Sequence, residues 1–248
     1  MIILKSSDEI ERMKVSCRIV AEILQILKSE IKPGVTTMSL NNIAETEAKK
    51  RKALPAFKGY SGYPHYLCCS VNEEVVHGMP SNRVLVEGDI LSIDFGVVFG
   101  GFYGDAAITV PIGNVSKIAS DLIRVTEGSL YAAIEVAKPG NRLSDISHAV
   151  QVYVEARGYS VVREFVGHGI GRNLHESPQI PNFGLPGRGI VLKKGMVLAI
   201  EPMINEKGSE VKVLGDGWTA VTCDKSLSAH FEHTVAITEN GSEILTRI

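Results

Sequence analysis

Apolar residues recur three and four positions apart in two long stretches of the chain, residues 9–31 and 117–137. This spacing puts them on one face of an α-helix, so the pattern predicts two amphipathic helices. Lys-Pro-Gly follows each stretch at once, and proline and glycine typically end helices. A second helical pattern comes after each Lys-Pro-Gly, within residues 31–52 and 137–158. The sequence therefore predicts the order long helix, Pro-Gly turn and second helix, and it predicts this order twice.

The strand patterns that follow the helices also occur twice. The segment VLVEGDILSIDFG, which contains Asp94, resembles VLKKGMVLAIEPM, which contains Glu201, and the two acidic residues coincide. Further along, DAAITV begins at Asp105 and resembles EHTVAI, which begins at Glu232. The larger spacing of this second pair indicates an insertion of about twenty residues in the second half.

A His-Gly pair completes the repeat, since HGMP at His77 echoes HGIG at His168. Each half then supplies two strand carboxylates and one histidine. We expect one catalytic domain over residues 1–248, built from related halves at about 1–113 and about 114–248. The predicted fold class is α+β, with pseudo-two-fold halves that share one curved antiparallel sheet and carry helices on its outer face.

The segment that contains Asp94 and Asp105 has the pattern of a β-hairpin, with strands at residues 90–99 and 102–110. A turn at the Phe-Gly pair would set the two carboxylates directly opposite each other. A turn at the following Gly-Gly pair would leave them diagonal. Either register brings the carboxylates within several ångströms on one face of the sheet.

Two buried carboxylates at such a distance repel unless a positive charge compensates them. Each could cap a turn or pair with a buried arginine. Glu201 and Glu232 favour another explanation, because the pseudo-two-fold would bring four carboxylates to one centre, and two divalent cations neutralise four carboxylates. His168, inside the glycine-rich GHGIG, would add an imidazole. Oxygen and imidazole ligands of this kind favour Mn, Fe, Co or Zn.

The composition is that of an ordinary globular protein, with 248 residues, 44% of them hydrophobic and 22% charged. The formal net charge of −2 gives no nucleic-acid footprint. No apolar run approaches the roughly 20 residues of a membrane helix. The four cysteines form no CxxC pair. We therefore expect a reduced, cytoplasmic setting.

Several motifs together resemble one enzyme family. They are VVHGMP, SIDFGVVFGGFYGDAA, GHGIGRNLHESPQIPN, LAIEPM, DGWTAVT and FEHTVAIT. At these residues the sequence resembles the type I, bacterial class of methionine aminopeptidases, which have the pita-bread fold. The resemblance covers nearly the whole chain. Glu201 follows His175 by only 26 residues, which leaves no room for the helical insertion of the type II class.

The resemblance implies a role for each matching residue. The ligands of two divalent metal ions would be Asp94, Asp105, His168, Glu201 and Glu232, with Asp105 and Glu232 bridging. His77 and His175 would contact the scissile amide. The methionine side chain would lie among Tyr60, Tyr63, Cys68 and Trp218, with Phe57 and Leu174 at two further pocket positions. Asn72 and Ser228 match positions that hold a monovalent cation in some members.

The implied reaction is removal of the N-terminal methionine from nascent proteins whose second residue is small. A metal-bridged hydroxide would attack the scissile carbonyl, and Glu201 would accept the proton and pass it to the leaving amine. The expected partners are nascent polypeptide N-termini, with contact to the ribosome. We expect a monomer with no membrane and no direct nucleic-acid contact.

Three other functions are compatible with the same fold. A catalytically silent binding protein of this fold would usually lack metal ligands, and an amidinohydrolase of the creatinase type would lack the carboxylate set. All five ligands are present here. A Pro-directed exopeptidase would share the ligands, and testing Met-Ala-Ser against Xaa-Pro peptides would distinguish it.

Overall fold

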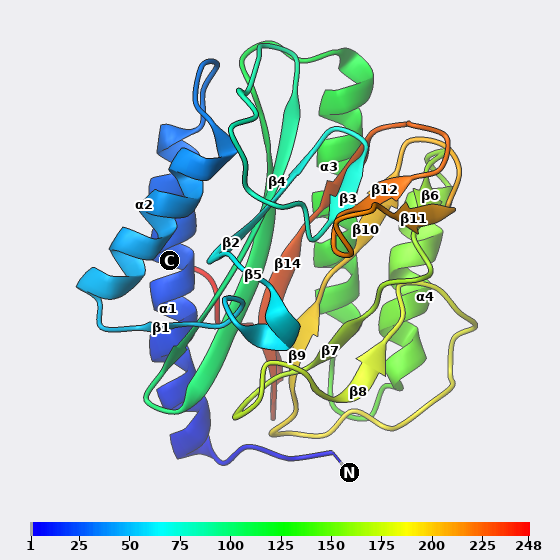
Figure 1. The fold of residues 1–248 in the computed structure, drawn as a ribbon. Coiled ribbons are helices and arrows are strands. Elements are labelled where there is room, and N and C mark those ends of the chain that lie inside the picture. The colour runs from blue at the N-terminus through cyan, green and yellow to red at the C-terminus, as the bar shows by residue number, and fades with distance from the viewer. Residues whose placement is uncertain (1) are drawn as a thin grey trace.

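A computed structural model describes residues 2–248, and its four long helices match the stretches predicted from the apolar spacing. In Figure 1 the first two lie together at the left of the view, and the other two lie to their right. No helix in this described part of the chain is long and apolar enough to cross a membrane. The helices are α1 (Ser7–Glu30), α2 (Thr37–Lys50), α3 (Lys117–Val136) and α4 (Leu143–Glu155).

Helix α1 shows why these segments are helical. Its first turn is closed by a capping box, in which the Ser6 hydroxyl accepts from the Glu9 N–H and the Glu9 carboxylate accepts from the Ser6 N–H. The apolar positions then recur with helical spacing and are buried against the sheet, as at Met13, Val20 and Leu27. The Lys-Pro-Gly that follows prevents a further turn.

Most strands join one nine-stranded antiparallel sheet, and the others form two three-stranded sheets. The large sheet contains β1 (Leu54–Pro55), β2 (Leu67–Val71), β4 (Ile90–Phe99), β5 (Phe102–Pro111), β7 (Gly167–Gly169), β8 (Glu176–Ile180), β9 (Val197–Ile200), β14 (Glu232–Thr238) and β15 (Gly241–Ile244). The small sheets contain β6 (Ser160–Val161), β10 (Met203–Asn205) and β13 (Ser228–His230), and β3 (Glu74–Val76), β11 (Val211–Val213) and β12 (Ala220–Thr222).

The strand order of the large sheet is symmetric about its central pair. The order β1-β4-β5-β14-β9-β7-β8 places β5 and β14 side by side, with β4 beside the first and β9 beside the second. One hydrophobic core lies under α1 and α2 and another lies under α3 and α4. This is the pita-bread arrangement expected from the sequence.

The central pair joins parts of the chain that are far apart. The Thr234 hydroxyl on β14 donates to the Asp105 carbonyl on β5 at 2.7 Å and accepts from the Asp105 N–H at 3.3 Å, although 129 residues separate the two. We call the β5–β14 contact the seam. Residues of both halves therefore meet at one place on the sheet.

The hairpin has the second of the two predicted registers. Asp94 lies opposite Ala107, and Asp105 lies opposite Gly96, so the carboxylates are diagonal. The turn is at Gly100-Gly101, where both φ angles are positive, at 58° and 81°. Only glycine adopts this conformation without strain, which explains why the turn takes this register.

One element of the predicted repeat is wrong in detail. When β4 is aligned with β9 so that Asp94 matches Glu201, Ser92 matches Ala199. Ser70 pairs with Ser92 and His168 pairs with Ala199, so the residue equivalent to His168 is Ser70. His77 lies beyond the end of β3, outside the large sheet. The His-Gly echo is a local sequence likeness, and the two histidines reach the same region from different elements.

Candidate active site

A cavity of about 320 Å³ lies on the face of the large sheet where the two halves meet. Its lining includes all thirteen residues predicted for metal binding, catalysis and the methionine pocket. Other residues on the lining are Ser61, Val76, Glu164, Phe165, Val166, Met203 and His230, which the sequence analysis did not identify. The cavity is therefore the candidate active site.

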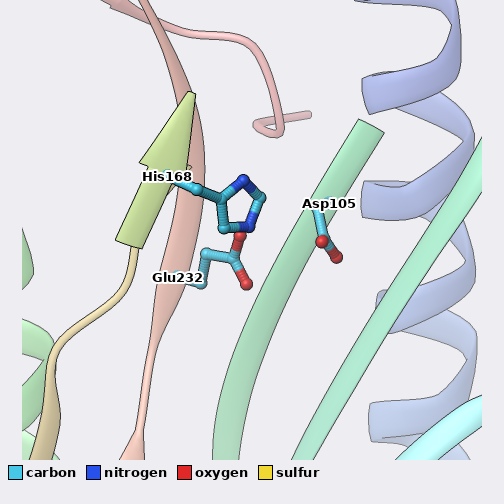
Figure 2. A group of neighbouring side chains, drawn as sticks. All are labelled: Asp105, His168 and Glu232. Atoms are coloured by element: carbon cyan, nitrogen blue, oxygen red, sulfur yellow. The ribbon is translucent and has the colours of Figure 1, made fainter. Parts of the chain in front are cut away.

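Three of the predicted metal ligands form a tight group at the centre of the cavity. Asp105 comes from β5, His168 from β7 and Glu232 from the first position of β14 (Figure 2). Each offers one ligand atom, and these atoms lie within 4.8 Å of one another. All three side chains are buried, so water screens little of the charge between them.

Glu201 and Asp94 lie next to this group. Glu201 follows β9, and its Oε1 is 3.4 Å from Nε2 of His168. Asp94 is on β4, diagonal to Asp105. The five predicted ligands are thus gathered at one centre, two from the first half of the chain and three from the second.

Burial raises the pKa of all four carboxyls. The pKa of Asp94 rises to about 7 for this reason. Burial and then the charges of Asp94 and Glu201 raise the pKa of Asp105 well above its usual range. The pKa values of Glu201 and Glu232 are raised well above theirs by burial and by the neighbouring carboxylates. Without a cation the four groups cannot all be ionised at neutral pH.

The donors of this centre fit divalent cations. One buried oxygen on each of Asp94, Asp105 and Glu232 has no hydrogen-bond partner, which is costly unless something binds there. No lysine or arginine among the described residues lines the cavity. This excludes the buried-arginine explanation. Oxygen-rich groups with one imidazole suit hard or borderline divalent metals.

His168 is held in the form that binds a metal. Its Nδ1 is 2.9 Å from the Gly169 carbonyl, which can only accept, so Nδ1 carries the proton and the lone pair is on Nε2. Burial, with the neighbouring His175, lowers the pKa of His168 to about 4, so the ring is neutral near pH 7. The free Nε2 lone pair faces the carboxylates.

The metal-stripped protein should lose stability as pH rises. Its folded state retains protons on carboxyls that release them near pH 4 when unfolded, so stability falls between about pH 4 and the folded pKa of Asp94, about 7. We expect a melting temperature several degrees lower at pH 8 than at pH 5, restored at pH 8 by added Mn²⁺. Asp105→Asn should flatten this dependence, and Asp121→Asn, on the exposed face of α3, should not. A melting temperature that rises over this range would contradict the expectation.

His175 lies beside His168 and touches Tyr60. The Tyr60 hydroxyl is 2.7 Å from Nδ1 of His175. The His175 ring packs edge-on against the His168 ring, with centroids 4.3 Å apart. The His175 ring is partly desolvated within the cavity, which lowers its pKa, so the neutral ring predominates at pH 7. If Tyr60 donates to Nδ1, the ring proton is on Nε2, and that nitrogen can donate to a substrate.

His77 is held in a conformation that is unusual for its residue type. Its φ is 59°, in the left-handed region, which non-glycine residues adopt at a cost. The next residue, Gly78, packs so closely that a Cβ there would lie 2.3 Å from the Cys69 carbonyl oxygen. The Gly78 N–H donates to the Ser70 hydroxyl at 3.1 Å. The strained backbone is therefore fixed by close contact with β2.

An apolar pocket adjoins the metal ligands. Tyr63 and Trp218 meet edge-to-face at 5.1 Å between centroids. Phe57, Cys68 and Leu174 are buried beside them, and Tyr60 stands at the rim, 40% exposed. Sequence reasoning did not identify Phe165, whose ring meets His77 edge-on at 5.4 Å, or Met203.

His230 is a further residue that sequence reasoning missed. It is fully enclosed, its Nε2 has no hydrogen-bond partner, and this atom lies 3.9 Å from Oε2 of Glu201. Glu201 therefore lies between two imidazoles. His230 comes two residues before Glu232, but it ends β13 whereas Glu232 begins β14, so a single-strand pattern in the sequence would not have placed it.

Asn72 and Ser228 are neighbours, outside the cavity. The Ser228 N–H donates to the Asn72 carbonyl at 2.8 Å, and the Asn72 side chain is engaged with Asp89 and the Ile90 N–H. Asn205 lies opposite Ser228 in the β10–β13 pair, and its buried Oδ1 has no partner. The monovalent-cation site stays a prediction.

Comparison with known proteins settles the family. A family model described as metallopeptidase family M24 matches residues 11–239. The chain belongs to this metallopeptidase family. Enzymes of family M24 are hydrolases, so the buried carboxylates and His168 belong to a hydrolytic metal enzyme.

Two similar proteins are named methionine aminopeptidase, and a more distant one is a prolidase. The chain is 55% identical to methionine aminopeptidase 1 of Bacillus subtilis, over all of both chains. A crystal structure of methionine aminopeptidase from Thermotoga maritima superposes with a TM-score of 0.99 and 52% identity, again over all of both chains. Prolidase from Pyrococcus furiosus is more distant, with a TM-score of 0.81 and 25% identity over 99% of this chain and 66% of that one.

Proposed function

We propose that this metallopeptidase removes the N-terminal methionine from proteins whose second residue is small. The observation that carries the proposal is the buried carboxylate centre beside an apolar, aromatic-lined pocket. The high identity to relatives named methionine aminopeptidase supports it. The lower identity to prolidase makes a Pro-directed exopeptidase the weaker candidate.

Two divalent ions, of Co, Mn, Fe or Zn, would be held by Asp94, Asp105, His168, Glu201 and Glu232, with Asp105 and Glu232 shared between them. When bound, the ions polarise the scissile carbonyl and make water acidic enough to attack at neutral pH. Three partnerless oxygens and a free imidazole nitrogen support this ligand set.

The protein's own groups manage the protons. Glu201, buried with a raised pKa, accepts a proton from the attacking water and passes it to the leaving amine. His175 donates from Nε2 to the carbonyl oxygen as negative charge develops there, with Tyr60 fixing the tautomer. His77, neutral because burial lowers its pKa to about 4, contacts the amide nitrogen.

The pocket selects the first residue by shape and by lack of charge. The pocket has no charged partner for the side chain of the first residue, although Glu164 lies on the wider cavity lining. It is lined by Tyr63, Trp218, Cys68, Phe57 and Leu174. An unbranched thioether fits such a pocket, whereas burying a lysine ammonium there would cost its hydration.

Peptide hydrolysis tests this function. The metal-loaded protein should release methionine from Met-Ala-Ser, with kcat/KM at least about 100-fold above that for Lys-Ala-Ser. Met-Phe-Ser should be cleaved slowly because the second residue is bulky. Equal rates on Met-Ala-Ser and Lys-Ala-Ser would refute the pocket, and a preference for Xaa-Pro peptides would favour the prolidase-like alternative.

If the protein has this function, it binds the N-termini of nascent proteins as they leave the ribosome. This places it in the cytoplasm. The four cysteines form no disulfide within residues 2–248, in keeping with a reduced setting. Asn72 and Ser228 would hold a monovalent cation, and the partnerless Oδ1 of Asn205 beside them supports that assignment.

A further inference from the structure

The loop between β7 and β8 presents His175 to the cavity and is folded around one carboxylate. Oε1 of Glu176 accepts from the main-chain N–H groups of Arg172 and Asn173, at 2.8 and 3.2 Å. The Gly171 carbonyl accepts from the Tyr103 N–H at 2.8 Å. The position of His175 therefore depends on where the Glu176 carboxylate lies.

The other oxygen of Glu176 is held by a residue near the start of the chain. Lys5 Nζ donates to Oε2 at 2.5 Å, and both side chains are only 4% exposed. Lys5 is itself fixed, because its N–H donates to the Gly195 carbonyl at 2.7 Å and its Nζ also donates to the Ile3 carbonyl at 3.1 Å. A side chain at Gly171 would lie 2.4 Å from Cε of Lys5, so the contact is close.

The Lys5–Glu176 ion pair is unusual because it is buried. Two charges removed from water lose hydration that their attraction only partly restores, and apolar side chains often stabilise a fold as well. An ion pair instead fixes the relative position of the two segments, since the ammonium must meet the carboxylate at one place. A second pair, Arg172 with Glu9 at 3.0 Å, joins the same segments but is exposed and screened.

We propose that Lys5 is a positioning residue for His175: its buried ion pair with Glu176 fixes the β7–β8 loop so that the imidazole meets the scissile carbonyl. Lys5 does not touch the cavity, and it acts on the reaction only through the loop. The proposal rests on the proposed function, in which His175 donates to the developing oxyanion.

A double-mutant cycle on the metal-loaded protein tests the proposal. Lys5→Met should lower kcat on Met-Ala-Ser by about 10- to 100-fold, as expected for a catalytic group displaced by about an ångström. KM and metal per chain should change little. In a His175→Ala background the same substitution should lower kcat less than about twofold, because the group that it displaces is gone. The control Arg172→Gln breaks the exposed pair of the same loop and should leave kcat within about twofold.

Three results would overturn the proposal: unchanged kcat in Lys5→Met, an equal loss in both backgrounds, or loss of metal. If Lys5→Met does not fold, Lys5→Met with Glu176→Gln removes both charges and leaves none unpaired, and the same cycle applies to it. If His175→Ala alone leaves kcat unchanged, the proposed role of His175 is refuted. If His175→Ala lowers kcat strongly but Lys5→Met lowers it equally in both backgrounds, only the role of Lys5 is refuted.

Discussion

Replacing Glu232 by glutamine should abolish turnover and reduce bound metal from the two ions per chain proposed above to one or fewer. Glu232 is buried at the seam, and its Oε1 has no hydrogen-bond partner. Its ligand atom lies within 4.8 Å of those of Asp105 and His168. Glutamine keeps the shape of the side chain but removes the negative charge that, on the proposed function, two cations would share. Metal per chain and hydrolysis of Met-Ala-Ser measure the two effects.

The matched control is Glu239→Gln. Glu239 follows the same strand and forms an exposed pair with Lys194 at 2.9 Å. This variant should retain two metal ions and full activity, because exposed pairs contribute little. Full activity of Glu232→Gln with two metals bound would remove Glu232 from the ligand set.

Replacing His175 by alanine should cut kcat by about 10²–10³, the usual loss of one donor to an oxyanion, and leave metal content and KM nearly unchanged. His168→Ala should instead lose metal and regain part of its activity at high metal concentration. The reason is that Nε2 of His168 faces the carboxylates, whereas His175 is exposed and bonded to Tyr60.

Measuring metal per chain and kcat for both variants side by side decides this division of roles. If His175→Ala loses metal as readily as His168→Ala, or keeps its kcat, the two histidines do not have the separate roles proposed. Tyr60→Phe offers an independent check on the tautomer, since it removes the hydroxyl but keeps the ring.

The helices and the central strands could be predicted from sequence because their signals are local. Apolar spacing, Pro-Gly stops and caps act within a few residues. The register of the Asp94–Asp105 hairpin could not be chosen in this way, because two turns were open and only the backbone angles at Gly100-Gly101 decide between them. The His-Gly echo misled for a similar reason, since likeness in sequence does not fix which strands pair.

The cavity was predictable in its charged members and less so in the rest. Buried carboxylates conflict with their apolar surroundings, and this conflict marks them in the sequence. His230, Phe165 and Met203 cause no such conflict, because one histidine or one apolar residue on a strand is ordinary. The contacts of His230 with Glu201 and of Phe165 with His77 follow from packing between segments that the sequence does not order. The Lys5–Glu176 pair, 171 residues apart, is hidden for the same reason.

The seam has a thermodynamic consequence. Two of the proposed ligands, Asp94 and Asp105, belong to the first half of the chain and the other three to the second, so neither half alone offers the full set. An ion that binds only the joined arrangement stabilises it by RT ln(1 + [ion]/Kd), or about 2.7 kcal/mol at one hundred times Kd. Besides its chemistry, a metal bound by this proposed set would hold the two halves together, and the free metal concentration would set the size of that stabilisation.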